Sequence, residues 1–311
     1  MRRGAHEALG KHAVQKYTGM QEREAALLVG DFLKNPEHWD AHLRRAAASL
    51  VLGVIYGLPP LRNSLDPDIV CVNRFVERAL HAAAPGSFLV EYFTWMEYLP
   101  RWMSPWRRYA EDSFAQDSML FERLFAEVKA RVASGDHTPS VAATIIGDEN
   151  HLDLTEKEAS WLSATLYAAG AETTSGQLAW FMLAMLLYPD TQKLAQDEID
   201  RVVGHGRLPS FSDFEQLHYT RALVMETLRW RAVPHRLSQD DYYEGYHLKK
   251  GTICVVNVWS LNHDPEVYGP NADEFEPRRH LDQDGNIKTG VADTKAENHH
   301  TFGFGRRPVM L

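Results

Sequence analysis

The chain has 311 residues, of which 44% are hydrophobic and 24% are charged, so it can form one large domain or two ordinary globular ones. Its net charge is −9, and its basic residues occur only singly or in short pairs, which argues against a nucleic-acid-binding protein. Two cysteines, Cys71 and Cys254, are too few for a disulfide framework and fit a compartment facing the cytosol. No apolar run of about 18 residues predicts a membrane span, and the first residues show no signal-peptide pattern.

Apolar periodicity and well-placed prolines predict helices through most of residues 13–233. Thr155 and Glu158 form a capping-box signature that opens a helix of about 45 Å, stopped before Pro189. A helix of that length is typical of one that crosses a whole domain. The predicted helices run over residues 21–32, 36–56, 67–84, 106–132, 155–187, 191–203 and 218–230.

The last third of the chain changes in composition. Residues 242–258 contain Gly245, Gly251 and a β-rich run, which predicts short strands and a turn. From Asp264 onward Pro, Gly, Asp and Asn favour coil. The chain is therefore predicted to be mainly α, helical over 1–233 and mixed strand and coil over 234–311.

Residues 85–106 are crowded with aromatic side chains, including Tyr92, Trp95, Tyr98 and Trp102. One interpretation is a packed connection between two helices. The other is a surface that enters lipid or roofs an apolar substrate cavity, because amphipathic aromatic side chains favour such boundaries.

The long predicted helix carries an unusual segment, Ala169-Gly170-Ala171-Glu172-Thr173-Thr174. A glycine inside a helix costs about 1 kcal/mol relative to alanine, and threonine hydroxyls compete for backbone carbonyls. A functional interpretation is a site where a small molecule needs room against the backbone and where an acid and a hydroxyl relay protons. The structural alternative is a close helix crossing with the threonines bonded back to their own helix.

Glu226 and Arg229 lie three residues apart and can pair on one helix face. Glu198 and Arg201 show the same pattern, and the simplest interpretation of both is a solvated surface pair of little energetic value. The residues around Glu226, from Leu223 to Trp230, are ones that favour burial, which distinguishes the later pair.

Two further segments follow, Phe275-Glu276-Pro277-Arg278-Arg279 and a glycine-rich run from Phe302 to Arg307. The glycines allow a backbone to lie close against something flat, and Arg307 is suited to an anionic group. An ordinary glycine-rich loop is the alternative.

Taken together and in this order, these segments resemble those of a cytochrome P-450 of the fungal microsomal type, over about residues 2–307. The resemblance implies an incomplete cytochrome P-450 fold, with 1–311 as a single partial domain. It implies that Gly170, Glu172 and Thr173 are catalytic, Thr173 lying nearest the bound dioxygen and Glu172 supporting proton delivery. It also implies a structural triad of Glu226, Arg229 and Arg279, although Arg278 replaces the usual Glu of that motif.

The same resemblance implies haem as the cofactor. The residues that would contact it are Arg2, His235, Phe302, Gly305 and Arg307. It implies a monooxygenase that hydroxylates a small apolar molecule with O₂ and electrons from an NADPH-cytochrome reductase, at the cytosolic face of the endoplasmic reticulum membrane. This chain itself is expected to contain no transmembrane segment.

The chain departs from the family at the haem loop, where Val309 occupies the position of the cysteine that ligates iron. Valine supplies no thiolate, whose electron push favours O–O cleavage, so no metal ligand is predicted there. We expect a chain truncated at both ends that is inactive as written. Two alternatives are a non-catalytic helical protein that binds an apolar ligand or partner, and haem ligation by His299 or His300.

Overall fold

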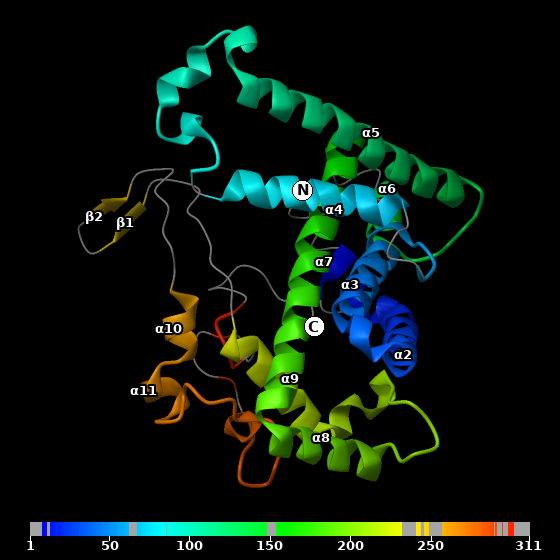
Figure 1. Cartoon of the computed structure of the whole chain (residues 1–311). Coiled ribbons are helices and arrows are strands. Elements are labelled where there is room, and N and C mark those ends of the chain that lie inside the picture. The colour runs from blue at the N-terminus through cyan, green and yellow to red at the C-terminus, as the bar shows by residue number, and fades with distance from the viewer. Residues whose placement is uncertain are drawn as a thin grey trace. The chain divides into compact units, whose positions relative to one another are not determined.

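A computed structural model gives the structure of the protein. It describes residues 8–10, 13–61, 67–84, 86–147, 154–231, 241–243, 246–248, 257–288, 290, 294 and 298–301. Contacts divide the chain into an N-terminal unit, Met1–Gly176, and a C-terminal unit, Gln177–Val309 (Figure 1). The described elements are mainly α, which confirms the predicted fold class.

The helices α2 to α5 of the N-terminal unit begin and end where the sequence predicts, within a few residues, whereas α6 was not predicted. Pro67 and Pro105 are first residues of helices, where the missing N–H costs nothing. One helix ends at Gly57, whose φ of 67° is the left-handed conformation that glycine adopts freely. The helices are α2 (Thr18–Lys34), α3 (Trp39–Tyr56), α4 (Pro67–Ala83), α5 (Pro105–Ala133) and α6 (Val141–Gly147).

The long helix α7 spans Glu156–Leu187, as predicted, and continues from the N-terminal unit into the C-terminal unit. Its capping box is present. Glu158 Oε2 accepts from the Thr155 backbone N–H at 2.8 Å, and Thr155 Oγ1 accepts from the Glu158 N–H at 3.3 Å. These bonds satisfy two of the donors that a helix start leaves open.

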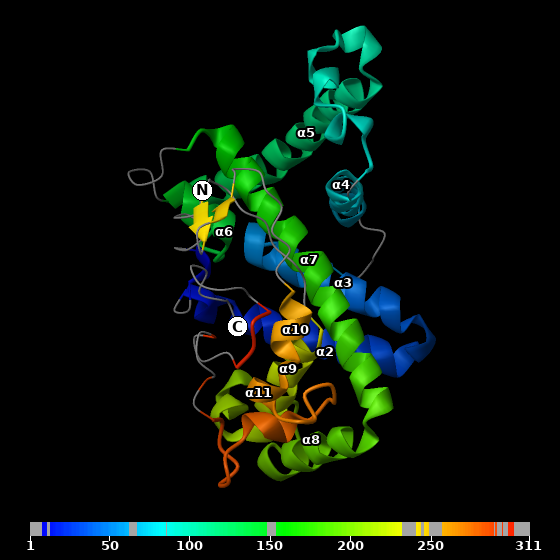
Figure 2. The same cartoon turned by 90° about the vertical axis from the view of Figure 1, so that its left-hand side faces the viewer.

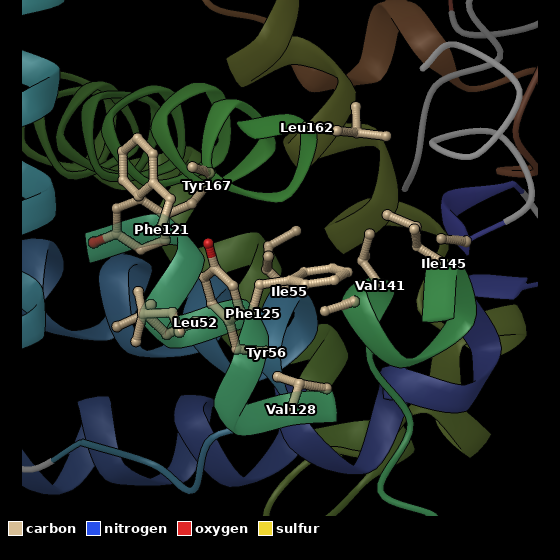
Figure 3. Packing of buried hydrophobic residues seen from close by; sticks show 14 of the residues in the cluster. Leu52, Ile55, Tyr56, Phe121, Phe125, Val128, Val141, Ile145, Leu162 and Tyr167 are labelled. Carbon is tan, nitrogen blue, oxygen red and sulfur yellow. The ribbon is translucent and has the colours of Figure 1, made fainter. Parts of the chain in front are cut away.

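The core of the N-terminal unit forms where α3, α5, α6 and α7 turn apolar faces toward one another (Figure 3). On α5 the buried residues follow helical spacing, so one stripe faces the core. Phe121 is edge-on to Phe75 of α4 and to Trp161 of α7, with ring centroids 5.0 and 5.1 Å away. The labelled core residues are Leu52, Ile55, Tyr56, Phe121, Phe125, Val128, Val141, Ile145, Leu162 and Tyr167.

The C-terminal unit is built around α9 (His218–Trp230). Helix α8 (Pro189–Val202), helix α10 (Val258–Asn262) and the 3-10 helix Pro277–His280 all contact α9 (Figure 2). Its core contains Tyr188, Trp230 and Phe275, whose ring centroids lie 5.5–6.2 Å apart. Tyr188 precedes α8, Trp230 ends α9, and Phe275 precedes the 3-10 helix, so this aromatic cluster links the three elements.

Two predictions for the last third of the chain need correction. A hairpin is present, with β1 (Asp241–Tyr243) antiparallel to β2 (Tyr246–Leu248), but Val258 begins α10 rather than ending a strand. The region expected to be coil contains α11 (Pro265–Tyr268) and the 3-10 helix Pro277–His280. Side chains cap these short helices, because Asp264 accepts from the Glu266 N–H and Glu276 from the Arg278 N–H. The run 251–256 lies outside the described residues.

The aromatic segment 86–104 forms three short 3-10 helices, Leu89–Glu91, Thr94–Tyr98 and Arg101–Met103. Tyr98 is 89% exposed and Trp102 is 75% exposed, so the packed-connection interpretation is wrong for this segment. Among the described residues, no helix is both long and apolar enough to cross a bilayer.

Candidate functional site

The unusual segment of α7 lies in the N-terminal unit and shows both features of a close helix crossing. Thr173 Oγ1 donates to the backbone carbonyl of Ala169 at 2.6 Å, so this hydroxyl is bonded back to its own helix. A Cβ added to Gly170 would lie 3.2 Å from both γ-carbons of Val51 on α3. Gly170 is therefore required by the approach of α3.

A neighbouring strip of α7 is open. Ala169, Thr173 and Gly176 are exposed and follow one another at helical spacing. A Cβ on Gly176 would meet no atom within 4 Å. This strip of small residues provides the room against the backbone that the functional interpretation requires, beside the position that needs Gly170.

Glu172 lies beside this strip and is half-exposed. Its Oε1 accepts a hydrogen bond from Nη1 of Arg44 on α3 at 3.4 Å. Arg44 Nε also donates to Asp40 Oδ2 at 2.9 Å. The acid of the α7 segment is thus paired with a cation that is distant in the sequence.

A second cluster lies in the C-terminal unit, centred on Glu226 of α9. Glu226 and Arg229 are fully buried and form a two-pronged ion pair, with both nitrogen–oxygen distances 2.7 Å. Arg229 also donates to the backbone carbonyls of Ala272 and Glu274 at 2.8 and 3.0 Å. A buried guanidinium needs this number of acceptors, because unpaired charge inside a protein is costly.

Arg279 and His280 complete the cluster from the 3-10 helix. Arg279 Nε donates to Glu226 Oε1 at 3.1 Å, and its other N–H groups donate to backbone carbonyls. His280 Nε2 lies 2.8 Å from Glu226 Oε2 and donates to it, because a carboxylate only accepts. The structure therefore brings together Glu226, Arg229 and Arg279, with His280 as a fourth member that sequence reasoning missed. The sequence feature that could have predicted His280 is its position directly after Arg279.

The electrostatics of the cluster follow from burial and hydrogen bonding. Burial by itself raises the pKa of the Glu226 carboxyl, but the hydrogen bonds from Arg229 and His280 outweigh it and lower the pKa to about 2. Burial lowers the pKa of His299 to about 3, with His280 and His300 acting in the same direction. Glu226 is thus ionised and His299 neutral at physiological pH.

Asn262 joins this cluster to the start of the glycine-rich run. Its Nδ2 donates to the Arg229 carbonyl and to Thr301 Oγ1, both at 3.0 Å, and its Oδ1 accepts from the His300 N–H at 2.7 Å. Thr301 Oγ1 donates to the carbonyl of Leu228 at 2.6 Å. The residue before Phe302 is therefore fixed to the end of α9. Asn262 is not among the site residues that the sequence predicts.

The earlier Glu-x-x-Arg pattern is not a surface pair. Glu198 is buried, and its carboxylate accepts from the backbone N–H groups of Tyr219 and Thr220 at 2.8 and 2.7 Å. It thereby satisfies open donors at the start of α9, where a negative charge is favourable. Arg201 is exposed and Glu198 is buried on backbone N–H groups, so the interpretation of Glu198 as half of a solvated surface pair is wrong.

The remaining predicted site residues lie outside the described residues. They are Arg2, His235, Phe302, Gly305, Arg307 and the Val309 position. His299 and His300, considered as alternative ligands, are described and buried. Within the described ranges, no group of three His, Cys, Asp or Glu side chains could hold a metal ion.

Comparison with known proteins identifies the fold. The family model for cytochrome P-450 matches residues 2–308. The chain belongs to the cytochrome P-450 family. A cytochrome P-450 monooxygenase of Armillaria gallica is 53% identical over 99% of the chain, and the chain covers 60% of that protein. Cytochrome P-450 monooxygenase 58 of Postia placenta is 45% identical over 99% of the chain, which covers 59% of that protein. Cytochrome P-450 monooxygenase iboC of Amanita muscaria is 38% identical over 95% of the chain, which covers 53% of that protein.

The chain spans 53–60% of the length of these three cytochrome P-450 relatives. Membership implies haem as the cofactor, and the open strip on α7 fits one face of it. A flat macrocycle needs small side chains where it approaches a helix, and Ala169, Thr173 and Gly176 supply them.

Proposed function

We propose that this chain carries the oxygen-activating helix and the structural triad of a haem-dependent monooxygenase that hydroxylates a small apolar molecule. The family match over residues 2–308 carries the proposal, because it includes the acid and hydroxyl of the α7 segment. When bound through a thiolate, haem supplies the chemistry that activates O₂. The protein's own residues bind that group, orient it and move protons.

Each predicted residue has a role in this proposal. Glu172 would take protons from solvent, and the Thr173 hydroxyl, once it leaves the Ala169 carbonyl, would carry them to the side of α7 where haem would bind. Gly170 allows α3 to close on α7 and so keeps the acid in place. Arg2, His235 and Arg307 would hold the haem propionates. Phe302 and Gly305 would shape the loop that approaches the iron.

The triad has a structural role. Glu226 ties α9 to the 3-10 helix through Arg279 and to its own helix through Arg229. A closed network of this kind is stable only when all its members are present, because removal of one leaves a buried charge unpaired.

Val309 limits the proposal. With valine at the family's cysteine position, the sequence as it stands would not form a haem thiolate and would not hydroxylate its substrate. The same observation favours a second candidate function, a non-catalytic helical protein that binds an apolar ligand or a partner. The two candidate functions predict different results when a cysteine replaces Val309: the monooxygenase gains turnover, and the non-catalytic protein does not.

The partners proposed for a catalytic form are an NADPH-cytochrome reductase and an apolar small molecule. The exposed aromatic segment 86–104 supports a location on a lipid surface, because Tyr and Trp side chains favour the boundary between water and hydrocarbon. The proposed location is the cytosolic face of the endoplasmic reticulum membrane.

A hybrid protein tests the proposed function. The 311 residues replace the matching segment of the Armillaria gallica relative, once unchanged and once with Val309→Cys. We expect the Val309→Cys hybrid to show a thiolate-type Soret band after reduction and addition of carbon monoxide, and to oxidise an apolar compound with NADPH and reductase. The unchanged hybrid should do neither. Turnover by the unchanged hybrid, or none by a haem-loaded Val309→Cys hybrid, contradicts the proposal.

A further inference from the structure

Arg44 and Glu172 are 128 residues apart in sequence, yet they form an ion pair within the N-terminal unit. Arg44 Nη1 lies 3.4 Å from Glu172 Oε1. Both side chains are about half-exposed, at 56% and 47%. Exposed pairs of this kind contribute only about 0–1 kcal/mol to stability, so stability alone does not account for the pairing.

The crossing of α3 and α7 places the pair. Gly170 allows Val51 to come close to α7. Arg44 precedes Val51 by seven residues, which is two helical turns along the same face of α3. Glu172 follows Gly170 by two residues. The same crossing of α3 and α7 thus contains both the approach of Val51 to Gly170 and the pairing of Arg44 with Glu172.

Asp40 fixes the direction of the guanidinium. It lies one turn before Arg44 on α3, and its Oδ2 accepts from Arg44 Nε at 2.9 Å. This hydrogen bond raises the pKa of Arg44, and Glu172 adds to the shift, so Arg44 remains a cation. Held by Asp40, Arg44 presents Nη1 to Glu172.

Arg44 faces Glu172 from α3. Tyr167 of α7 is buried in the core, and burial first and the charge of Glu172 second raise the pKa of its phenol. In the described part of the chain, Arg44 is the hydrogen-bond partner of Oε1, and Oε2 has no protein partner. One oxygen is thus held and the other is left to solvent.

From this geometry, and resting on the proposed function, we propose that Arg44 is a positioning residue for proton delivery. It holds Glu172 Oε1, so that Oε2 takes a proton from solvent water and passes it to the Thr173 hydroxyl. Each proton that leaves Oε2 is replaced by one from water, and no other bond forms or breaks. Arg44 touches neither haem nor substrate, and it acts only through Glu172.

The first test uses the Val309→Cys hybrid loaded with haem. Arg44→Gln should lower the ratio of product to hydrogen peroxide by about tenfold, less than the ~10²-fold or more expected for loss of the proton donor itself. The solvent isotope effect on product formation should rise. Arg44→Lys should keep most of the ratio, because it keeps the charge. The Soret spectrum and the KM for substrate should not change.

Arg123→Gln is the matched control. Arg123 pairs with Glu127 on α5 at 2.7 Å, and both side chains are 48% exposed. Arg123→Gln therefore removes a similarly exposed ion pair that does not involve Glu172. It should leave the product-to-peroxide ratio unchanged. An unchanged ratio and isotope effect in Arg44→Gln would overturn the inference, as would an equal change in Arg123→Gln.

A second test does not depend on activity. In the 311-residue chain labelled with ¹⁵N, the Nε–H resonance of Arg44 should move when Glu172→Gln is introduced and stay in place with Glu156→Gln, which removes the partner of Lys129 instead. A resonance that does not respond to Glu172→Gln contradicts the pairing and the inference. A Val309→Cys hybrid that makes no product contradicts the proposed function, and this resonance still decides the pairing.

Discussion

Glu226 is the carboxylate at the centre of the buried ion-pair cluster in the C-terminal unit. It accepts from Arg229, Arg279, His280 and the backbone N–H of Glu276, and it is fully buried. Its low pKa means that the folded protein gains stability from the ionised form. That contribution is full above pH about 4.5 and is lost as the pH falls toward about 2.

Glu226→Gln should lower the free energy of unfolding by about 3–5 kcal/mol, because it leaves two buried guanidinium groups without their carboxylate. Denaturant unfolding of the 311-residue chain measures the change. Glu215→Gln is the control, because Glu215 pairs with Arg221 while 82% exposed. Its effect should be below about 1 kcal/mol. Equal losses in the two variants would contradict the structural role of Glu226.

His299 gives the chain a second pH dependence at higher pH. Its folded pKa of about 3 lies below the ordinary value of 6.5, so between these values the unfolded chain binds a proton that the folded chain does not. The free energy of unfolding should therefore fall by about 1.4 kcal/mol per pH unit as the pH drops through this window. His299→Gln should flatten that slope in unfolding curves recorded from pH 7 to 4. The same slope in both proteins would contradict the assignment.

At the residue scale, the apolar residues around Glu226 indicated that its pair with Arg229 is buried, and the family resemblance added Arg279 as the third member of the triad. It missed His280 and Asn262, whose partners are 54 residues and 33–39 residues away in the chain. No local pattern records such pairings. The same limit explains Glu198, whose partners lie at the start of the next long helix.

At the element scale, α3 and α7 form the crossing that organises the α7 segment. Val51 comes close to α7 at Gly170, and the neighbouring strip of exposed small residues ends at Gly176. The two glycines therefore differ in their surroundings although they share a helix.

Gly176→Ala should stabilise the chain by up to about 1 kcal/mol, because alanine favours a helix and nothing within 4 Å opposes its Cβ. Gly170→Ala should be less favourable than Gly176→Ala by about 1–3 kcal/mol, because its Cβ lies 3.2 Å from Val51. Val51→Ala in the Gly170→Ala background should recover part of the difference. Thermal unfolding compares the four proteins, and equal effects at the two glycines would rule out a tight crossing.

The aromatic segment 86–104 should bind lipid. Replacing Tyr98 and Trp102 together by Ser should weaken binding of the chain to phospholipid vesicles by about tenfold or more. Each of the two aromatic side chains exposes a large apolar area that lipid would bury. Phe211→Ser is the control, since Phe211 is also exposed, at 47%, but lies in the C-terminal unit. Vesicle sedimentation measures the binding. Unchanged sedimentation of the double variant would count against a lipid-facing role.

The elements themselves were predictable where they are long. Periodicity and prolines located α2 to α5 and α7 to α9, and the capping box located the start of α7, but the seven-residue helix α6 was not predicted. The short helices α10 and α11 were missed because they contain only five and four residues. Their formation depends on single capping side chains and tertiary contacts rather than on a repeating apolar pattern.

At the scale of the whole molecule, family membership rests on the match over residues 2–308, whereas the proposed lack of activity rests on position 309, which follows that match. The helices, the triad and the open strip on α7 form the described part of the scaffold. Val309 is the departure with chemical consequences, because a thiolate gives the iron the electron density that favours O–O cleavage.

Product formation by the unmodified 311-residue chain tests this most directly. Supplied with haem, NADPH, reductase and an apolar compound, the chain should yield no oxidised product and no thiolate-type Soret band. An oxidised product that requires NADPH and haem would show that the scaffold activates oxygen without sulfur on the iron, and would contradict the account.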